Sequence, residues 1–447
     1  MSTGARTGFA DLPLHGGRVP EWLAGRMARL GRVVVEALVI HYGRAEVLRR
    51  LAHPFWFQSL GAVMGMDWHS SGITTSVLGA LKRGLAPVSA ELGLWVCGGR
   101  GRHSRRTPDE LRAVAARTGA DGDALARTSR LVAKVDSAAV QDGFQLYLHG
   151  FVVAADGSWT VVQQGMSAER RQARRYHWLS LGLQSFVDAP HAAIEGAPQG
   201  TIVNLADRRA GPSRAAQVEL LRAGPGAVLR ALPDALGAAR ARAAAETAAG
   251  AAAAAAETAA AAAAPARAPV PVQLALPHLA LPDRHEVLAR DVVPRRLAAA
   301  LAAAAERGPQ DFPDLLLTPG VGARTLFALA QVAEVVHGAP CRFTDPARFS
   351  LAHGGKDGHP FPVPLRVYDE TLRVLRRAVD RARLGDGERL DAIRRLDDEA
   401  RRLEHAAAAA AAGPADVDAF LAAERRRAHA YGGMTVRGPA EPLLPIE

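Results

Sequence analysis

Residues 317–326 read LTPGVGARTL and are the most informative ten residues of the chain. Gly320 and Gly322 permit a tight turn, because glycine adopts positive φ readily and lets other groups approach the backbone. Apolar residues recur at every third or fourth position from residue 325 to residue 336, which is the spacing of a packed helix. The stretch therefore predicts the turn of a helix-hairpin-helix, with the Gly-Val-Gly amides at a helix N-terminus.

Such a turn is suited to an anion, because unpaired N–H groups and the positive end of the helix dipole point at the same place. We expect the turn and the first residues of its helix to contact a nucleic-acid phosphate: Gly320, Val321, Gly322, Arg324 and Thr325. The alternative is an ordinary structural turn between two helices.

The composition fits a globular protein with a polyanionic partner. The chain has 447 residues, 49% hydrophobic and 22% charged, and a formal net charge of +10. Arginine supplies nearly all of the basic residues and is the better bidentate ligand for phosphate. Only Cys97 and Cys341 occur, which excludes a disulfide framework and a thiolate cluster and indicates the cytoplasm. We expect no membrane segment, because no charge-free apolar run of about 18 residues occurs outside the alanine tract.

The alanine tract divides the chain and predicts an α+β protein. We expect a mixed α/β domain over residues 1–230, an Ala-rich linker over 231–270, an all-helical domain over 271–405 and a low-complexity tail over 406–447. Alanine favours helix but offers little side-chain area for a core, so the tract is interpreted as a helical or partly disordered spacer.

Local patterns place the main elements of both domains. The spacing of apolar residues predicts a buried helix over 21–41. A β-hairpin is expected over 144–164, with a turn at Asp156-Gly157 and with Gln145, Tyr147 and His149 on one face of its first strand. Helices are predicted in the C-terminal domain over 285–305, 310–317, 323–337, 364–384 and 386–405, and the last two could bind a protein partner.

Acidic and histidine residues in the N-terminal domain form one candidate chemical site. Asp67 and His69 stand two apart before Ser70-Ser71-Gly72, which suits a metal site or an acid/base pair, although a capped turn explains them too. A metal-dependent hydrolase would combine these two residues with Asp136, Asp142 and His177. A divalent metal is then the cofactor to expect.

Further residues suit contacts with nucleic acid. Arg102 and Arg105 belong to a basic, glycine-rich loop that suits phosphates. Lys356, in a second glycine-rich loop, would add another phosphate contact. Near the β-hairpin, the side-chain amides of Gln163 and Gln164 are expected to read a base edge. The rings of Tyr176 and Trp178 are expected to stack on an unpaired base. A buried polar network around the hairpin is the alternative for this group.

Six motifs taken together resemble the domain of unknown function 763 family, from about residue 5 to residue 384 without the alanine tract. That family supplies no settled activity. The motifs are the segments 6–17, 67–72, 141–143, 163–166, 317–322 and 353–360.

A second, local resemblance is to helix-hairpin-helix DNA glycosylases such as endonuclease III. In those enzymes the hairpin and its helix are followed by a glycine and, seven residues later, by the catalytic aspartate. Here Asp345 follows Gly338 at that spacing. The Schiff-base lysine of the bifunctional members would fall near Arg324, which cannot form an imine, so no lyase step is implied. A helix N-cap before Pro346 is the other interpretation of Asp345.

These observations favour a protein that binds duplex or single-stranded DNA and acts in repair or nucleic-acid processing, either as a glycosylase or as a nuclease. The alternatives are a metal-dependent hydrolase of nucleotides or phosphoesters and a non-catalytic protein adaptor.

Overall fold

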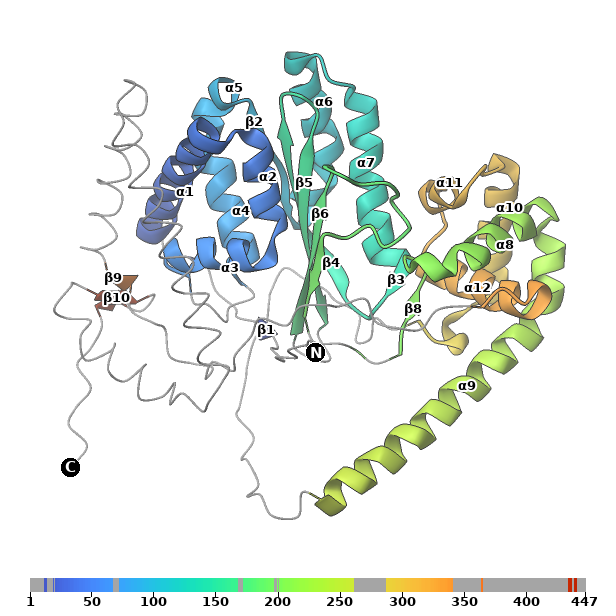
Figure 1. The fold of residues 1–447 in the computed structure, drawn as a ribbon. Coiled ribbons are helices and arrows are strands. Elements are labelled where there is room, and N and C mark those ends of the chain that lie inside the picture. Colours follow the sequence, from blue (N-terminus) through green and yellow to red (C-terminus); the bar gives the residue numbers. More distant parts are fainter. Residues whose placement is uncertain are drawn as a thin grey trace, which may run out of the picture.

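The structure, a computed structural model, describes residues 12–13, 19, 21–66, 72–167, 172–196, 199, 201–260, 287–340, 363–364, 433–435 and 438–439. Figure 1 shows an antiparallel sheet with helices on both faces and a group of further helices beside it. The chain is therefore a mixed α/β protein, with the sheet in its N-terminal part and helices in its C-terminal part.

The main sheet has the strand order β1-β6-β5-β4-β2, and β7 pairs with β6. Its strands are β1 (Leu12–Pro13), β2 (Leu94–Arg100), β4 (Gln145–Ala154), β5 (Trp159–Ser167), β6 (Gln172–Leu179) and β7 (Ala193–Glu195). The predicted hairpin is confirmed as β4 and β5. Gly157 supplies the positive φ of its turn, at 82°, and Asp156 Oδ1 accepts a hydrogen bond from the amide of Ser158 at 2.9 Å.

A β-bulge in β4 corrects one prediction about this hairpin. Leu146 pairs with Gly165 and Leu148 pairs with Gln164, so Tyr147 is an extra residue that has no partner of its own in the register. The extra residue breaks the alternation of faces. Tyr147 packs in the core on one face of the sheet, whereas His149 reaches Ser129 on the other. The two side chains were expected to share a face, and they do not.

The first four helices cover one face of the sheet (Figure 1). They are α1 (Glu21–Tyr42), α2 (Arg44–Ala52), α3 (Pro54–Val63) and α4 (Gly72–Leu85). Their apolar side chains, such as Leu30, Leu51 and Leu81, join those of β4 and β5 in one core. The helix expected over 21–41 is therefore confirmed.

The other face is covered by α6 (Thr107–Thr118) and α7 (Gly122–Lys134). At the end of α7 the helix continues as a π-helix, η3 (Val135–Ala139), and leads into β3 (Val140–Gln141), which pairs with β8 (Val203–Asn204). The short elements complete this part: α5 (Ser89–Leu92), η1 (Ala86–Val88), η2 (Gly101–Arg106) and η4 (Arg208–Ala210).

The helical group beside the sheet shares its hydrophobic core. It contains α8 (Gly211–Arg222), α9 (Pro225–Ala260), η5 (Ala289–Asp291), α10 (Pro294–Arg307), α11 (Phe312–Leu317) and α12 (Ala323–His337). Three of the five expected C-terminal helices are thus confirmed; those over 364–384 and 386–405 lie outside the described residues. One continuous cluster of buried side chains includes Phe151 and Trp178 of the sheet as well as Leu326 of α12.

The alanine-rich stretch begins inside this core. Helix α9 runs unbroken from Pro225, and Val228, Leu232 and Leu236 are buried against the helical group. Residue 230, the expected end of the N-terminal domain, therefore lies within a packed helix. The C-terminal part of α9 extends away from the other helices (Figure 1).

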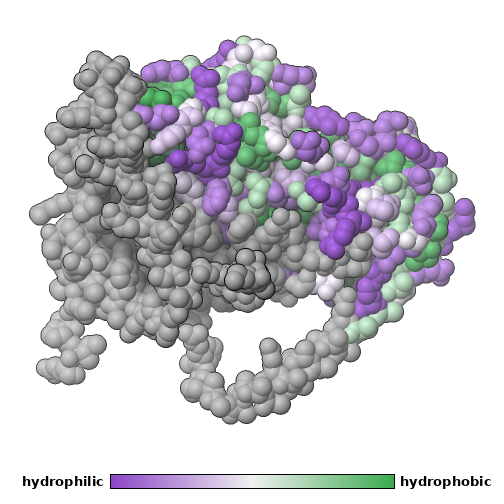
Figure 2. All heavy atoms as spheres, viewed as in Figure 1, coloured by the Kyte–Doolittle hydropathy of each residue, from purple (hydrophilic) through white to green (hydrophobic). Residues whose placement is uncertain are grey.

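The described helices, the surface and the last short strands complete the picture of the fold. In the part of the chain that the structure covers, no helix combines the length and apolar character that crossing a membrane requires. On the face shown in Figure 2, hydrophilic and hydrophobic residues are interspersed over the helical group. The last described segments are the strands β9 (Val363–Pro364), β10 (Gly433–Thr435) and β11 (Gly438–Pro439).

Candidate functional site

The glycine-rich stretch forms a tight turn between α11 and α12. The amide of Val321 donates to the carbonyl of Thr318 at 3.1 Å, and the Val321 side chain is buried. Gly320 is exposed and has a φ of 84°, a conformation that glycine adopts without strain. The turn is therefore anchored through the one apolar side chain at its centre, and its two glycines lie toward the outside.

The turn leads directly into the first amides of α12. Gly322 is the N-cap of this 15-residue helix and has no side chain to cap those amides. The amides of a first helical turn have no acceptor within the helix. The side chain of Arg324 is exposed beside them. This end of α12 thus combines free donors, the positive end of the helix dipole and a guanidinium.

The back of the turn is held by α7 and β3. Lys134 Nζ donates to the carbonyl oxygen of Val321 at 2.7 Å, and Gln141 Nε2 donates to that of Ala323 at 2.8 Å. Burial lowers the pKa of Lys134 from its usual value. These two bonds fix the carbonyls of Val321 and Ala323 toward α7 and β3, so the amides that follow them, those of Gly322 and Arg324, point the opposite way.

The acidic residues around the turn between α11 and α12 are already engaged. Within residues 311–326 the sequence contains two, Asp311 and Asp314. Asp311 caps α11 by accepting from the amide of Asp314, and Asp314 forms an ion pair with Arg127 of α7 at 2.6 Å. Acidic side chains therefore do not surround the turn within this segment.

A cavity of about 400 Å³ opens next to the turn, between β3, β8, α9, η5 and α12. Phe327 and Gln331 line it from successive turns of α12, and Gln141 and Asp142 line it from the end of β3. Gln141 also donates to the carbonyl of Ala323, so the same residue contacts α12 and lines the cavity.

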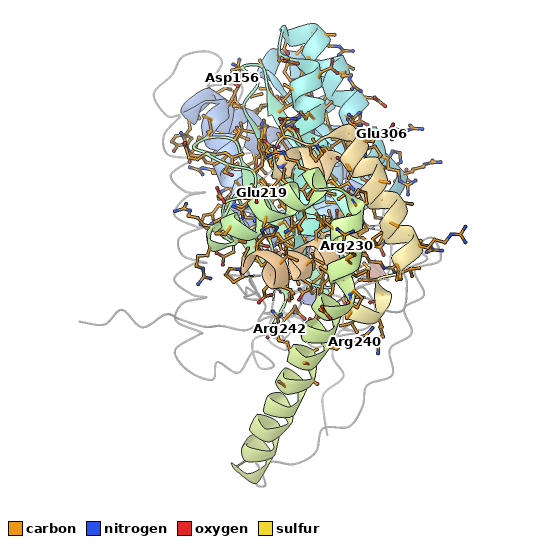
Figure 3. The ribbon with its side chains drawn as sticks, turned by 90° about the vertical axis from the view of Figure 1, so that its right-hand side faces the viewer. Asp156, Glu219, Arg230, Arg240, Arg242 and Glu306 are labelled. Atoms are coloured by element: carbon orange, nitrogen blue, oxygen red, sulfur yellow. The ribbon has the colours of Figure 1, made fainter. Side chains whose placement is uncertain are left out.

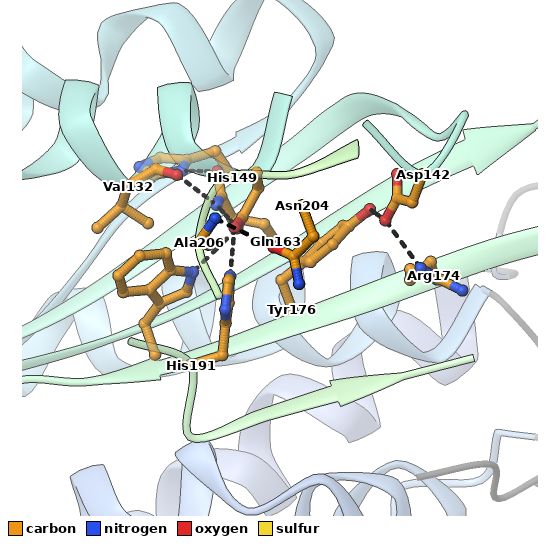
Figure 4. Close-up of polar contacts among 11 residues, drawn as sticks. Val132, Asp142, His149, Gln163, Arg174, Tyr176, His191, Asn204 and Ala206 are labelled. Atoms are coloured by element: carbon orange, nitrogen blue, oxygen red, sulfur yellow. Dashed lines mark hydrogen bonds and ion pairs between the residues drawn. The ribbon is translucent and has the colours of Figure 1, made fainter. Parts of the chain in front are cut away.

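A buried polar network lies deeper, between the sheet and α7 (Figure 4). Asp136 of η3 is fully buried and accepts hydrogen bonds from three side chains. The donors are Trp178 Nε1 at 2.9 Å, His191 Nε2 at 2.5 Å and Gln163 Nε2. A carboxylate can be buried in this way because each of its oxygens has a donor.

Histidine 149 extends this network to α7. Its Nδ1 lies 2.6 Å from Gln163 Oε1, and its Nε2 lies 2.9 Å from Ser129 Oγ. Burial is the main cause that lowers the pKa of His149. The imidazole therefore belongs to the network as a neutral group.

Asp142 joins β6 to the rim of the cavity. Its Oδ2 accepts from Tyr176 Oη at 2.6 Å and from Arg174 Nη1 at 3.0 Å, and its Oδ1 accepts from the amide of Phe144. The Arg174 guanidinium stacks over the Phe144 ring at 4.8 Å. Burial, followed by the charge of Asp142, raises the pKa of Tyr176 well above its usual value.

The other face of β6 carries a separate set. Arg175 contacts Glu195, Gln58 and Thr74, and its guanidinium lies over the ring of Phe57 at 4.9 Å. Burial raises the pKa of Glu195. His177 lies on the same face, with Nδ1 3.2 Å from the carbonyl of Leu51, and burial lowers its pKa well below the usual value.

The structure does not bring the described residues of the predicted metal site together. Asp136 and Asp142 lie on one face of the sheet and His177 on the other, so these three do not converge on one ion. Within the described ranges, no three His, Cys, Asp or Glu residues are placed to hold a metal. Asp67, His69, Asp345 and Lys356 lie outside the described residues.

The expected base-reading residues are buried. Gln163, Gln164, Tyr176 and Trp178 are each 0% exposed. Tyr176 and Trp178 cannot stack on an unpaired base in this conformation, because their rings are packed between the sheet and the helices. The buried-network alternative describes this group better. Arg102 and Arg105, by contrast, are exposed on η2.

Sequence reasoning did not single out several residues that the structure brings together. His191 follows a loop with no periodic pattern, and its partner Asp136 is 55 positions away. Gln331 occupies a position in α12 where the apolar pattern predicts core. Arg240 and Arg290, which also line the cavity, stand in and beyond the alanine-rich stretch.

The fold and the site define a class: an α/β protein with a polar network inside its sheet layer and a glycine turn and cavity beside it. The family model described as "Protein of unknown function (DUF763)" matches residues 8–363, and the chain belongs to this family. No curated protein and no solved structure matches the chain. The resemblance to DNA glycosylases is not shown by these comparisons.

Proposed function

We propose that this protein binds DNA through the turn between α11 and α12 and acts in DNA repair or nucleic-acid processing. The observation that supports the proposal is the outward-facing pair Gly320 and Gly322 at the N-terminus of a long helix, with Arg324 exposed beside it. Backbone amides at such a site contact phosphate without reading sequence. A DNA substrate also agrees with the net charge of +10, and we propose the cytoplasm as the location.

The geometry of Gly322 permits a clean test. A Cβ added at this position meets no atom within 4 Å, and its φ of −145° is ordinary extended backbone. Gly322→Asp therefore folds and caps α12, which raises the free energy of unfolding by about 0.3–1 kcal/mol. The same carboxylate occupies the amides and repels a phosphate. We expect at least a tenfold loss of affinity for DNA, about 1.4 kcal/mol.

The measurement is fluorescence anisotropy with a labelled duplex and a labelled single strand, repeated over a series of salt concentrations. For wild type, log K should fall with log salt by about 0.9 for each duplex phosphate contacted, and the variant should lose roughly one such contact. Gly322→Ala is the matched control, because it adds the Cβ without charge. Equal affinity and equal salt slope for wild type and Gly322→Asp would refute this role of the turn.

Gly320 is unsuited to this comparison. Its φ of 84° is far from the value that proline requires, so Gly320→Pro would disturb the turn itself. A loss of binding in that variant would not separate a lost contact from a misfolded hairpin.

The reaction class needs a second experiment. We propose incubation of the protein with damaged, single-stranded and branched DNA, with and without Mg²⁺ or Mn²⁺. Base release would indicate a glycosylase, and strand cleavage that requires metal would indicate a nuclease. DNA binding without either product, together with a stable protein partner, would favour an adaptor.

A further inference from the structure

The cavity beside α12 contains two amide groups whose hydrogen-bonding capacity is incomplete. Gln331 is 2% exposed, its Oε1 accepts from Arg242 at 3.4 Å, and its Nε2 has no partner. Gln141 uses Nε2 twice, toward Ala138 and Ala323, whereas its buried Oε1 has no partner. A buried polar atom without a partner costs about 1–3 kcal/mol. Both residues line the cavity, and the unused donor and the unused acceptor are buried in its wall.

Part of the cavity wall is apolar. Phe327 contributes a ring from α12, and Ile202 and Val203 contribute branched side chains from the segment that carries β8. All three are 6–7% exposed. Apolar walls with a few placed polar groups are typical of a small-molecule site, and a cavity of about 400 Å³ lies within the usual range of such sites.

Two arginines add positive charge to the lining. Arg240 of α9 and Arg290 of η5 both have exposed side chains, and neither forms an ion pair with another described residue. Arg242 differs from them, because it is held by Glu334 at 3.1 Å. Figure 3 shows Arg240 and Arg242 on α9 at the point where the helix leaves the rest of the molecule. An anionic group bound in the cavity would therefore meet two available guanidiniums.

We infer that this cavity binds one nucleotide, with the base between Phe327 and the branched side chains and the phosphate near Arg240 and Arg290. The Watson–Crick edge of a nucleobase offers both donors and acceptors, which matches the unused donor of Gln331 and the unused acceptor of Gln141. Arginine is the side chain best suited to bidentate contact with phosphate. A simple anion would leave the amides and the apolar wall without a role.

The inference deepens the proposed function and rests on it in one respect. The nucleotide has two sources: a free mononucleotide or one nucleotide turned out of a strand held at the α11–α12 turn. The second source requires DNA binding, whereas the first does not. Gln141 links the two places, because it lines the cavity and also holds the carbonyl of Ala323 behind the turn.

Calorimetric titration of the full-length protein with AMP tests the site, with adenosine and inorganic phosphate as partial ligands. We expect AMP to bind more tightly than either. Gln331→Leu and Arg240→Glu should each weaken AMP at least tenfold. Arg230→Glu is the matched control, because Arg230 is exposed on the same helix, ten positions away, and does not line the cavity. Its affinity should equal that of wild type.

The strand source is tested with 2-aminopurine placed in a single strand and in a duplex, since its fluorescence rises when the base leaves the stack. A rise that Gln331→Leu abolishes while overall DNA affinity is kept identifies a nucleotide of the strand. AMP binding without such a rise identifies a free nucleotide. Thermal unfolding shows that each variant is folded. Absence of both signals in wild type, or equal signals in wild type and Gln331→Leu, overturns the inference.

DNA binding at the turn and nucleotide binding in the cavity can be refuted independently. Gly322→Asp should remove DNA binding and leave AMP binding intact, whereas Gln331→Leu should do the reverse. If Gly322→Asp leaves DNA binding unchanged but AMP still binds, the turn is wrong and the cavity stands.

Discussion

Replacing Asp136 tests whether the buried network stabilises the fold. Asp136 is fully buried and accepts from Gln163, Trp178 and His191. In Asp136→Ala, Trp178 Nε1 and one N–H of Gln163 Nε2 lose their acceptor at side chains that are 0% exposed, while Gln163 Nε2 keeps its 3.4 Å bond to the carbonyl of Val132. At about 1–3 kcal/mol for each buried donor, with a smaller term for the cavity, the free energy of unfolding should fall by about 3–5 kcal/mol.

Asp136→Asn should cost less, about 2 kcal/mol, and the difference reveals the cause. The remaining carbonyl oxygen can still accept from Gln163 and Trp178, while the new amide donates to His191 after that ring moves its proton to the other nitrogen. What is lost is the charge that strengthens these hydrogen bonds. The prediction therefore ranks wild type above Asn and Asn above Ala.

The assay is urea unfolding followed by far-UV circular dichroism, with the midpoint compared at constant m-value. Asp109→Asn is a suitable control, because this carboxylate is 80% exposed and pairs only with Arg112; we expect a change below about 0.5 kcal/mol. A loss below about 1 kcal/mol in Asp136→Ala, with an unchanged m-value, would refute the account of this network.

Two other predictions concern stability. Burial lowers the pKa of His149 and of His177, so both stay neutral in the folded state and bind protons on unfolding; stability is then present above pH 6.5 and is lost as the pH falls. The free energy of unfolding should drop by about 1–3 kcal/mol between pH 7 and 5.5, with part of the loss offset by Glu195, whose raised pKa acts in the opposite direction; an unchanged urea midpoint over this range would contradict it. Gly84→Ala should destabilise by about 1–3 kcal/mol, because its Cβ would lie 2.1 Å from a backbone carbonyl of α1, whereas Gly79→Ala on the same helix, with open space around its Cβ, should stabilise by about 0.5–1 kcal/mol. Thermal unfolding of the two variants would show the opposite shifts, and shifts of the same sign would contradict the packing argument.

Elements with strong local signals were predictable from the sequence. The Asp156-Gly157 turn specified the β4–β5 hairpin, and apolar spacing specified α1 and α12. The bulge at Tyr147 was not predictable, because it depends on how β4 registers against β5 and leaves no mark in the composition.

The candidate site was only partly predictable, and for a physical reason. Tyr176 and Trp178 next to a run of arginines resemble a surface for nucleic acid. Yet Arg174 is paired with Asp142, 32 positions away, and Arg175 with Glu195, and these pairings allow the middle of β6 to be buried. Pairings over such distances decide burial, and periodicity does not encode them.

The core packing of α9 could likewise not be predicted from the composition of the alanine-rich stretch. Alanine gives little area for a core, yet Val228, Leu232 and Leu236 at the start of the helix supply enough apolar surface to pack against the helical group. The part of α9 that is mostly alanine begins after Leu236 and continues the same helix, so the linker and the packed helix are one element.

Because α9 is one continuous helix, it sets the distance and the direction of its far end relative to the core. One end is fixed in the core, and at 1.5 Å per residue the 18 residues that follow Arg242, up to Ala260, span about 27 Å. The end of α9 at Ala260 therefore lies at a fixed distance from the cavity, in a direction that the packed first turns determine. Shortening the alanine stretch by a whole number of helical turns would shorten this distance and keep the direction in which the chain leaves the helix. Removing two residues would also rotate that direction about the helix axis.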